Sequence, residues 1–187
     1  MRNFKIVLQY DGTRYQGWQR QVSTDNTIQG KLEALLSKMC GTSVEIQGAG
    51  RTDAGVHAYG QVASFHMDTD KTATEVMEYM NMYLPEDISV ICCKEVPQRF
   101  HARLNAKGKV YCYHIWNSTR KPIFRRKYVY EVSGKLDMTA IRQAADALCG
   151  THDYQSFTST KRGKKSTVRT VESIDIQRVG EEIIFTF

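Results

Sequence analysis

A glycine-rich stretch, residues 48–60, contains the side chains best suited to chemistry. Its glycines stand at positions 48, 50, 55 and 60 and let the backbone take positive φ and approach a ligand closely. Arg51 and Asp53 lie between them, two residues apart, so in extended backbone their side chains project to the same side and can form a charge-assisted pair. Such a pair would keep the carboxylate ionised at neutral pH.

An ionised carboxylate at Asp53 is compatible with several roles. In a glycine-lined pocket it can act as a nucleophile, a general base or a metal ligand. A structural Arg51–Asp53 pair that braces a tight turn fits the spacing equally well, so spacing alone does not separate a catalytic role from a structural one. A metal-dependent phosphodiesterase is disfavoured, because no second carboxylate is clustered with Asp53 in the sequence.

Basic residues gather in two stretches of the chain. Residues 97–130 hold nine Lys or Arg and no acid, and residues 154–171 hold five more, again without an acid. The rest of the chain carries 12 basic residues against 20 acidic ones. A solvated basic loop would explain either stretch alone. Both together favour a polyanionic partner, because phosphate contacts release counterions. Nucleic acid is favoured over a membrane, since neither stretch has the pattern of an amphipathic surface helix.

The composition narrows the class of protein further. The 187 residues contain no run near the roughly 18 apolar residues of a membrane-spanning helix. The opening aliphatic run, residues 6–8, is too short for a secretory signal, so we expect a soluble, cytoplasmic protein with no membrane association. Five cysteines without a Cys-x-x-Cys spacing indicate neither a disulfide framework nor a zinc site and favour buried, reduced thiols.

The glycine-rich stretch is expected to join two strands of an N-terminal half. The predicted elements are strands over 4–10, 44–47, 61–67 and 88–96, a helix from residue 28 to Gly41, and a helix from residue 73 that stops before Pro85. Asn26 or Thr27 can cap the first helix, and Thr72 with Glu75 has the form of a capping box for the second.

Strands and a single helix follow again in the second half of the chain. The predicted elements are strands over 110–116 and 128–132, a helix through 141–148 that ends at Gly150, strands over 171–178 and 183–187, and a hairpin at 179–182. This order predicts an α+β fold with two α+β halves, residues 1–105 and 106–187, that share a largely antiparallel sheet with helices on one face.

Four segments of the chain carry recognisable motifs. One is the glycine-rich stretch itself, residues 49–58, AGRTDAGVHA. The other three are residues 10–21, YDGTRYQGWQRQ; residues 100–103, FHAR; and residues 109–113, KVYCY. Together they resemble, in order, the TruA family of tRNA pseudouridine synthases, and residues 49–58 are similar to the active-site motif of that family. The resemblance extends from the first predicted strand to the last residue of the chain, and it implies the pseudouridine synthase fold.

The resemblance also implies an activity. It implies isomerisation of uridine to pseudouridine at positions 38, 39 and 40, in the anticodon stem-loop of tRNA, without a cofactor or metal. The enzyme is expected to be a homodimer in which one tRNA spans both subunits. Asp53 takes the position of the family's nucleophile, and its attack on C6 of the uracil or on C1′ of the ribose both remain open. A uridine inside a stem must be flipped out, at a cost of a few kcal/mol.

Two further residues take catalytic positions by this resemblance. Arg51 matches the residue that pairs with the aspartate and enters the vacated base stack. Tyr111 matches the substrate-binding tyrosine, whose ring lies against the flipped base and whose hydroxyl lies near the proton on C5. Without the resemblance, a tyrosine in an alternating strand would be interpreted as core. His57 is expected to be a structural, hydrogen-bonded histidine, since the carboxylate and the tyrosine already account for the chemistry.

The remaining candidates are expected to contact tRNA: Arg103, Arg14, Arg20, Gln21, Lys161, Arg162, Lys164 and Lys165. Arg103 is expected at backbone phosphate near the site, with a surface salt bridge as the alternative. For Tyr15 and Trp18, packing within the loop is the preferred interpretation.

The chain departs from the family pattern at its C-terminal end. Family members continue for several tens of residues beyond the strand that here ends at Phe187, through a glycine-aromatic and Met-Val-Arg segment that helps to build the catalytic cleft. The resemblance therefore implies that the half over residues 106–187 is truncated. An RNA-binding or chaperone-like protein that keeps the loop without activity is the alternative from a different class.

Overall fold

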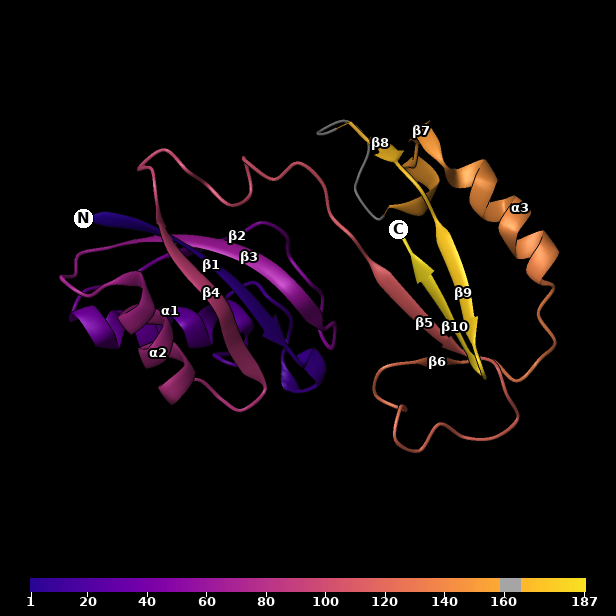
Figure 1. The fold of residues 1–187 in the computed structure, drawn as a ribbon, viewed down its shortest axis with the longest axis horizontal. Helices are drawn as coiled ribbons and strands as arrows, with labels where there is room; N and C mark the ends of the chain where they lie inside the picture. Colours follow the sequence, from indigo (N-terminus) through magenta and orange to yellow (C-terminus); the bar gives the residue numbers. More distant parts are fainter. Residues whose placement is uncertain (159–165) are drawn as a thin grey trace. The chain divides into compact units, whose positions relative to one another are not determined.

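The computed structural model describes residues 1–158 and 166–187, which form two compact units, residues 1–107 and 108–187 (Figure 1). The predicted boundary after residue 105 lies in the same connection between strands. Each unit combines antiparallel strands with helices, so the predicted α+β class is confirmed.

Unit 1 is built on a four-stranded antiparallel sheet with the order β2-β3-β1-β4. The strands are β1 (Arg2–Tyr10), β2 (Ile46–Gly48), β3 (Ala58–Met67) and β4 (Ile88–Val96). All four lie where the sequence predicted strands. β3 begins three residues earlier than expected, so the end of the glycine-rich stretch is already part of the sheet.

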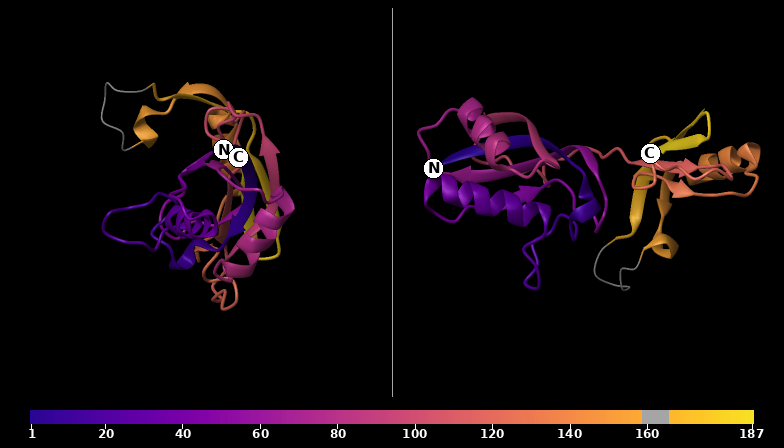
Figure 2. Two further views of the ribbon diagram at one scale, coloured as in Figure 1. Left: turned by 90° about the vertical axis from the view of Figure 1, so that its left-hand side faces the viewer. Right: turned by 90° about the horizontal axis from the view of Figure 1, so that it is seen from below.

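Two helices cover one face of this sheet (Figure 2). Both begin at predicted caps. The Thr27 side chain caps α1 (Ile28–Cys40), and Gly41 ends that helix with a φ of 73°. Thr72 and Glu75 form the predicted capping box of α2 (Ala73–Tyr83). Residues 12–14 add a short 3-10 helix, η1 (Gly12–Arg14), in the loop after β1.

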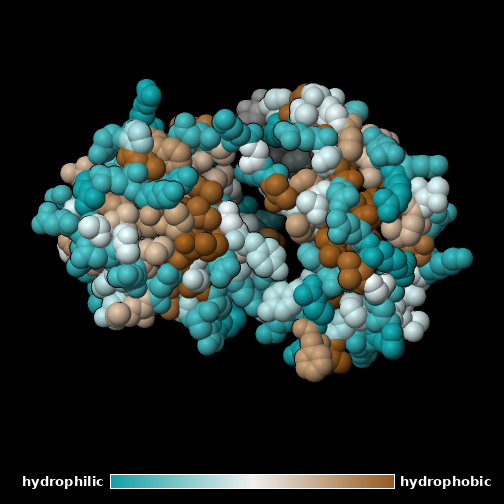
Figure 3. Space-filling view, in the orientation of Figure 1, coloured by the Kyte–Doolittle hydropathy of each residue, from teal (hydrophilic) through white to brown (hydrophobic). Residues whose placement is uncertain are grey.

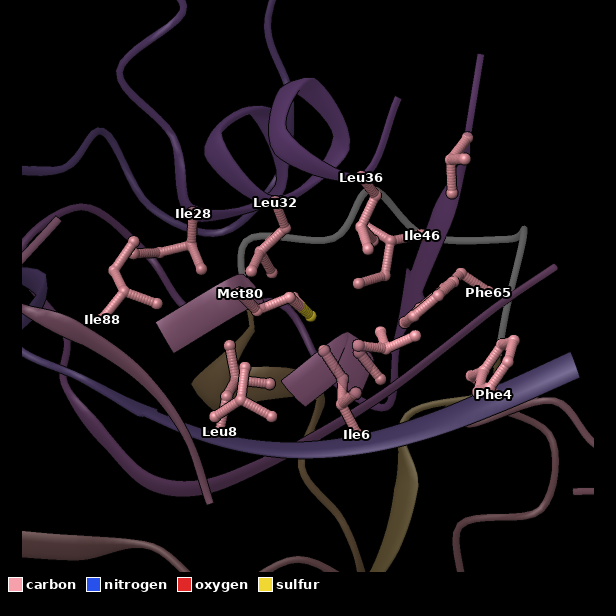
Figure 4. Close-up of a cluster of buried hydrophobic side chains, with 14 of the residues drawn as sticks. Phe4, Ile6, Leu8, Ile28, Leu32, Leu36, Ile46, Phe65, Met80 and Ile88 are labelled. Atoms are coloured by element: carbon pink, nitrogen blue, oxygen red, sulfur yellow. The ribbon is translucent and has the colours of Figure 1, made fainter. Parts of the chain in front are cut away.

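The hydrophobic core of unit 1 lies between the sheet and these helices. Alternate residues of β1, among them Ile6 and Leu8, point toward Leu32 and Leu36 of α1 and Met80 of α2 (Figure 4). Each of these side chains is fully buried, and burial of one such side chain contributes about 1.5–3 kcal/mol. The core therefore fixes β1 firmly, including the strand end from which the candidate site is built.

In unit 2, the described residues form a four-stranded sheet with the order β6-β5-β10-β9 and a separate two-stranded ribbon, β7-β8. The elements are β5 (Cys112–Trp116), β6 (Tyr130–Glu131), α3 (Met138–Leu148), β7 (Gly150–Asp153), the 3-10 helix η2 (Gln155–Phe157), β8 (Val168–Val171), β9 (Asp175–Val179) and β10 (Glu182–Thr186). Helix α3 packs through Ala145 against Ile176 and Ile183. The predicted hairpin between β9 and β10 is confirmed, with Gly180 in its turn at a φ of 61°.

The sequence was wrong about strand partners in unit 2. The strand predicted over residues 171–178 is two strands, because β8 pairs with β7 whereas β9 pairs with β10. The ribbon strand β7 was missed, since its four residues are all exposed and show no apolar alternation. Most pairs among the described strands are antiparallel, as predicted, and β5 pairs with β6 in parallel. Apolar periodicity predicts where strands lie but not which strands pair, because pairing depends on contacts between residues distant in sequence.

The surface is mixed, and the thiols are less buried than predicted. Hydrophilic residues cover most of the face drawn in Figure 3, with hydrophobic residues in small groups between them. All five cysteines are free; Cys112 is exposed and the others are only partly buried, so the prediction of buried thiols is wrong. Among the described residues, no helix is both long enough and apolar enough to span a membrane.

Candidate active-site loop

The candidate active-site loop, residues 49–57, connects β2 to β3 and contains a tight turn. The Val56 N–H donates to the Asp53 carbonyl oxygen at 3.2 Å, and Gly55, the third residue of the turn, has a φ of 79°. Positive φ at this position is typical of a type II turn, and glycine adopts it without steric cost. Asp53 is exposed at the first position of the turn, so a substrate can reach its carboxylate.

The predicted Arg51–Asp53 ion pair is absent from the part of the chain that the structure describes. Both residues are exposed, and the ion pairs of unit 1 involve other side chains. An exposed pair gains little because solvent screens it and its side chains lose conformational entropy. The interpretation of Arg51 and Asp53 as a structural pair that braces the turn is therefore wrong, and the turn must be supported from elsewhere.

That support comes from a bracing segment, residues 10–18, which follows β1 and lies against the loop. The Trp18 N–H donates to the Thr52 carbonyl oxygen at 2.9 Å, and the Gly55 N–H donates to the Tyr15 carbonyl oxygen at 3.3 Å. These two hydrogen bonds hold the loop backbone on both sides of the candidate nucleophile.

Two glycines allow this close approach. A Cβ at Gly12 would lie 2.0 Å from the Val56 carbonyl oxygen, and a Cβ at Gly17, whose φ is 88°, would lie 2.7 Å from the Thr52 carbonyl oxygen. Both contacts are with backbone atoms, so side-chain rotation cannot relieve them. The loop and the bracing segment therefore touch at positions where only glycine fits.

A pair of hydroxyls adds a side-chain link at the same place. Tyr10, the last residue of β1, is 4% exposed, and its hydroxyl lies 2.9 Å from the Thr52 Oγ1. Burial raises the pKa of Tyr10, with the hydrogen bonds to Thr52 and Gln61 acting in the opposite direction. The Gln61 Nε2 also donates to the Gly50 carbonyl oxygen at 2.8 Å, which ties down the start of the loop.

His57 closes the other end of the loop through hydrogen bonding, as the structural role predicted. Its Nδ1 lies 3.1 Å from the Gly12 backbone nitrogen and 3.0 Å from the Asp11 Oδ1. A neutral ring accepts from the Gly12 N–H at this nitrogen, whereas a protonated ring donates to Asp11. Either state fastens the end of the loop to the bracing segment.

Comparison with known proteins identifies the family to which the chain belongs. A family model described as tRNA pseudouridine synthase matches residues 6–105 and 144–187, which include the bracing segment and the whole candidate loop. This chain belongs to the tRNA pseudouridine synthase family. The resemblance inferred from the motifs is therefore confirmed, together with the enzyme class that it implies.

Individual relatives cover nearly the whole chain. It is 48% identical over 176 residues to tRNA pseudouridine synthase A 2 of Bacillus cereus (strain ZK / E33L), a match that covers 94% of this chain and 72% of that protein. It is 50% identical over 177 residues to tRNA pseudouridine synthase A of Bacillus sp. (strain KSM-64), covering 95% and 72%. The enzyme of the same name from Exiguobacterium sp. (strain ATCC BAA-1283 / AT1b) is 44% identical over 187 residues, covering 100% and 75%.

In this pseudouridine synthase, the loop-packing prediction for Tyr15 and Trp18 is confirmed, since they are 4% and 2% exposed. The Tyr15 hydroxyl donates to the Asp87 Oδ1 at 2.5 Å, and burial followed by the Asp87 carboxylate raises the pKa of Tyr15. Arg14 donates from Nε to the Asp87 Oδ2 at 2.8 Å. Its side chain nevertheless stays 62% exposed, so it is accessible to a polyanion.

Three other tRNA-contact candidates of unit 1 are also at the surface. The Arg20 Nη1 lies 3.2 Å from the Oε2 of Glu33, and the arginine side chain is 60% exposed. Gln21 is exposed and donates from Nε2 to the Gln16 carbonyl oxygen at 2.9 Å. Arg103 is exposed and takes part in none of the ion pairs found among the described residues, so the surface salt bridge considered for it is not formed.

Tyr111 lies in unit 2, just before β5. Its backbone forms two hydrogen bonds with Phe187, N–H to carbonyl oxygen at 3.2 Å and carbonyl oxygen to N–H at 2.9 Å. The residue is 61% exposed, so the interpretation as a core tyrosine is wrong and its ring is available to a substrate.

The structure brings together only part of the predicted site. Arg51 and Asp53 share the loop of unit 1, whereas Tyr111 belongs to unit 2, and each unit is described by itself. Four basic candidates lie outside the described residues: Lys161, Arg162, Lys164 and Lys165. Within the described residues, no group of three or more His, Cys, Asp or Glu could hold a metal ion.

Sequence reasoning missed the side chains that fix the loop, namely Tyr10, Thr52, Gln61 and Asp87. Thr52 lies inside the quoted motif, directly before Asp53, and these two signals could have drawn attention to it. Tyr10 also began the quoted segment 10–21, but it lies 42 residues from Thr52. Gln61 lies 11 residues from Gly50 and Asp87 lies 72 residues from Tyr15, so nothing local ties either residue to the loop.

Proposed function

We propose that this chain converts uridine to pseudouridine at positions 38, 39 and 40, in the anticodon stem-loop of tRNA, with Asp53 as the nucleophile. The observation that carries the proposal is an exposed carboxylate at the first position of a turn, in a loop that bears the family motif and is fixed by a neighbouring segment. The named relatives are tRNA pseudouridine synthases, which supports tRNA uridine as the substrate.

The reaction that we propose conserves every atom of the substrate. The Asp53 carboxylate attacks either C6 of the uracil or C1′ of the ribose, and the N1–C1′ bond breaks. The base then rotates, a bond forms between C5 and C1′, the proton on C5 leaves, and N1 gains a proton. The carboxylate is released unchanged. Because the product is an isomer of the substrate, the reaction consumes no oxidant, reductant or co-substrate, and the proposal includes no cofactor or metal.

Arg51 and Tyr111 serve the flipped nucleotide in this proposal. Unstacking the uridine costs a few kcal/mol, and the gap that it leaves must be filled. Arg51 is exposed beside the nucleophile, so its planar guanidinium can enter the gap and stack on the neighbouring bases. The exposed ring of Tyr111 supports the flipped base, a contact typically worth about 1–3 kcal/mol, and its hydroxyl accepts or relays the C5 proton.

The basic stretches over residues 97–130 and 154–171 supply contacts to the tRNA backbone. The individual candidates are Arg103, Arg14, Arg20, Gln21, Lys161, Arg162, Lys164 and Lys165. On the strength of the family resemblance, the proposal includes a cytoplasmic homodimer in which one tRNA spans both subunits.

The test maps pseudouridine chemically in unmodified tRNA transcripts after incubation with the protein or with Asp53→Ala. Asp70→Ala is the matched control, since Asp70 is an exposed carboxylate of the same unit outside the loop. We expect product at positions 38–40 from the unsubstituted protein and from Asp70→Ala. Asp53→Ala should yield none while keeping most of its affinity for tRNA.

Two results would contradict the proposal in different ways. Undiminished product from Asp53→Ala would exclude Asp53 as the nucleophile. Tight binding of tRNA without product from the unsubstituted protein would favour the RNA-binding alternative.

A further inference from the structure

We propose that Tyr10 and Thr52 are positioning residues for the Asp53 carboxylate, acting through the hydrogen bond between their hydroxyls. The inference rests on the proposed role of Asp53 as nucleophile. It assigns a function to two side chains that do not themselves touch the reacting atoms.

Thr52, which directly precedes the nucleophile, is held by two hydrogen bonds. Its carbonyl oxygen accepts the Trp18 N–H at 2.9 Å, and its Oγ1 lies 2.9 Å from the Tyr10 hydroxyl. The carbonyl belongs to the peptide that joins Thr52 to Asp53, so the first contact orients that peptide plane. The second prevents the residue from rotating about it, and together they set the direction in which the Asp53 side chain leaves the backbone.

Tyr10 is a rigid anchor because the sheet of unit 1 holds it. It ends the central strand β1, opposite Ala58 of β3 and Ile88 of β4. Its ring packs 6.2 Å, centroid to centroid, from the ring of Trp18 and is almost completely buried. The end of a central strand moves little, so the Tyr10 hydroxyl holds Thr52 at a fixed position relative to the core.

The Tyr10 hydroxyl is not required to fill space. Phenylalanine would occupy the same volume without the cost of burying a polar group, which is repaid only when the group is hydrogen-bonded. The partners of the Tyr10 hydroxyl are Thr52 Oγ1, at 2.9 Å, and the Gln61 side chain. The hydroxyl therefore orients the loop through hydrogen bonding and is not needed for packing of the core.

Positioning of this kind matters because attack requires close and aligned atoms. A misplacement of about 1 Å can reduce a reaction rate by two orders of magnitude. The Asp53–Val56 turn fixes the loop after the nucleophile, and Thr52 fixes it before. With both in place, the remaining freedom of the carboxylate is the rotation of its own side chain.

Hydroxyl-deletion variants test the pair. Tyr10→Phe and Thr52→Val each remove one hydroxyl and keep the shape of the side chain, and Thr52→Ser keeps the hydroxyl. The measured quantity is the single-turnover release of tritium from tRNA labelled at uracil C5, with the protein in excess, alongside the affinity for tRNA. We expect Tyr10→Phe and Thr52→Val to slow release about tenfold at unchanged affinity, which is the effect of about 1.4 kcal/mol on the barrier.

Two further variants separate positioning from general stability. The double variant Tyr10→Phe/Thr52→Val should be no slower than Tyr10→Phe, because Tyr10→Phe already removes the hydrogen bond that Thr52→Val removes. Thr52→Ser should react near the unsubstituted rate. Ser37→Ala is the matched control: it removes a hydroxyl that accepts the Val44 N–H at 2.9 Å, elsewhere in unit 1. It should lower the melting temperature comparably and leave the rate unchanged.

The outcomes distinguish this inference from the proposed function on which it rests. Full rates in Tyr10→Phe and Thr52→Val, with Asp53→Ala inactive, would overturn the positioning role and leave the nucleophile in place. A slowed Ser37→Ala of equal stability would also overturn it, because loss of stability alone would then explain the rates. Full activity of Asp53→Ala would overturn the proposed function itself.

Discussion

Replacing Gly17 by alanine tests whether the bracing segment holds the candidate active-site loop by direct backbone contact. Gly17 has a φ of 88°, and an added Cβ would lie 2.7 Å from the Thr52 carbonyl oxygen and 3.1 Å from the Asp53 carbonyl carbon. Neither atom can be moved by changing a rotamer. The substitution must therefore displace the loop, the bracing segment or both.

The magnitude follows from two separate costs. Left-handed backbone costs a residue with a Cβ about 1–2 kcal/mol, and overpacking typically adds about 1–3 kcal/mol. Gly17→Ala should therefore destabilise unit 1 by about 2–5 kcal/mol. Gly41→Ala is the matched control, because Gly41 has a φ of 73° but no atom within 4 Å of an added Cβ. Gly41→Ala should lower the free energy of unfolding only by the cost of left-handed backbone, about 1–2 kcal/mol.

The assay uses the position of the two tryptophans, Trp18 in unit 1 and Trp116 in unit 2. In a Trp116→Phe background, the fluorescence of Trp18 reports unfolding of unit 1 alone as urea is added. We expect a lower midpoint for Gly17→Ala than for Gly41→Ala, and a reduced single-turnover rate for Gly17→Ala only. Equal midpoints with equal rates would refute the contact between the bracing segment and the loop.

Three further predictions concern the support of the site, the stability of unit 2 and the RNA contacts. Asp87→Asn should weaken the hydrogen bond from the buried Tyr15 hydroxyl and destabilise unit 1 by about 1–3 kcal/mol, measured by the same fluorescence assay. Although burial, the largest influence, raises the pKa of Glu182, hydrogen bonds chiefly from His114 hold it below the ordinary 4.5. A lowered pKa stabilises the fold above about pH 4.5 and loses this contribution as the pH falls through the folded value, so Glu182→Gln should flatten the loss of hydrogen-exchange protection in β10 on acidification. Alanine at Lys161, Arg162, Lys164 and Lys165 should flatten the salt dependence of tRNA binding, by about 0.7–0.9 in log–log slope for each lost phosphate contact. An unchanged slope would show that these four residues do not contact the tRNA.

Local signals in the sequence predicted the elements of unit 1 well. The capping box at Thr72 and Glu75 and the terminal Gly41 determine helix ends through contacts within a few residues, so they are visible in the chain itself. The alternation over β1 marked the face that points into the core. The glycines and the motif mark the loop of unit 1 in the sequence itself, without any knowledge of the residues that it contacts.

Long-range relations could not be predicted in the same way. The expected Arg51–Asp53 pair assumed extended backbone, whereas Asp53 begins a turn and both side chains point into solvent. The hydrogen bond between Tyr10 and Thr52 joins residues 42 positions apart, and no periodic pattern in the sequence predicts it. The pairing of β8 with β7 likewise depends on which strand ends meet in space, and this is decided by packing rather than by local preference.

The most direct test of the central claim is the single-turnover rate of Asp53→Asn. Asparagine keeps the size of the side chain but replaces the proposed nucleophilic carboxylate by a neutral amide. The turn and the bracing contacts do not use the Asp53 side chain. We predict that pseudouridine formation at positions 38–40 falls to background while the dissociation constant for tRNA changes less than about threefold, or about 0.7 kcal/mol. A rate within tenfold of the unsubstituted protein would contradict Asp53 as the nucleophile.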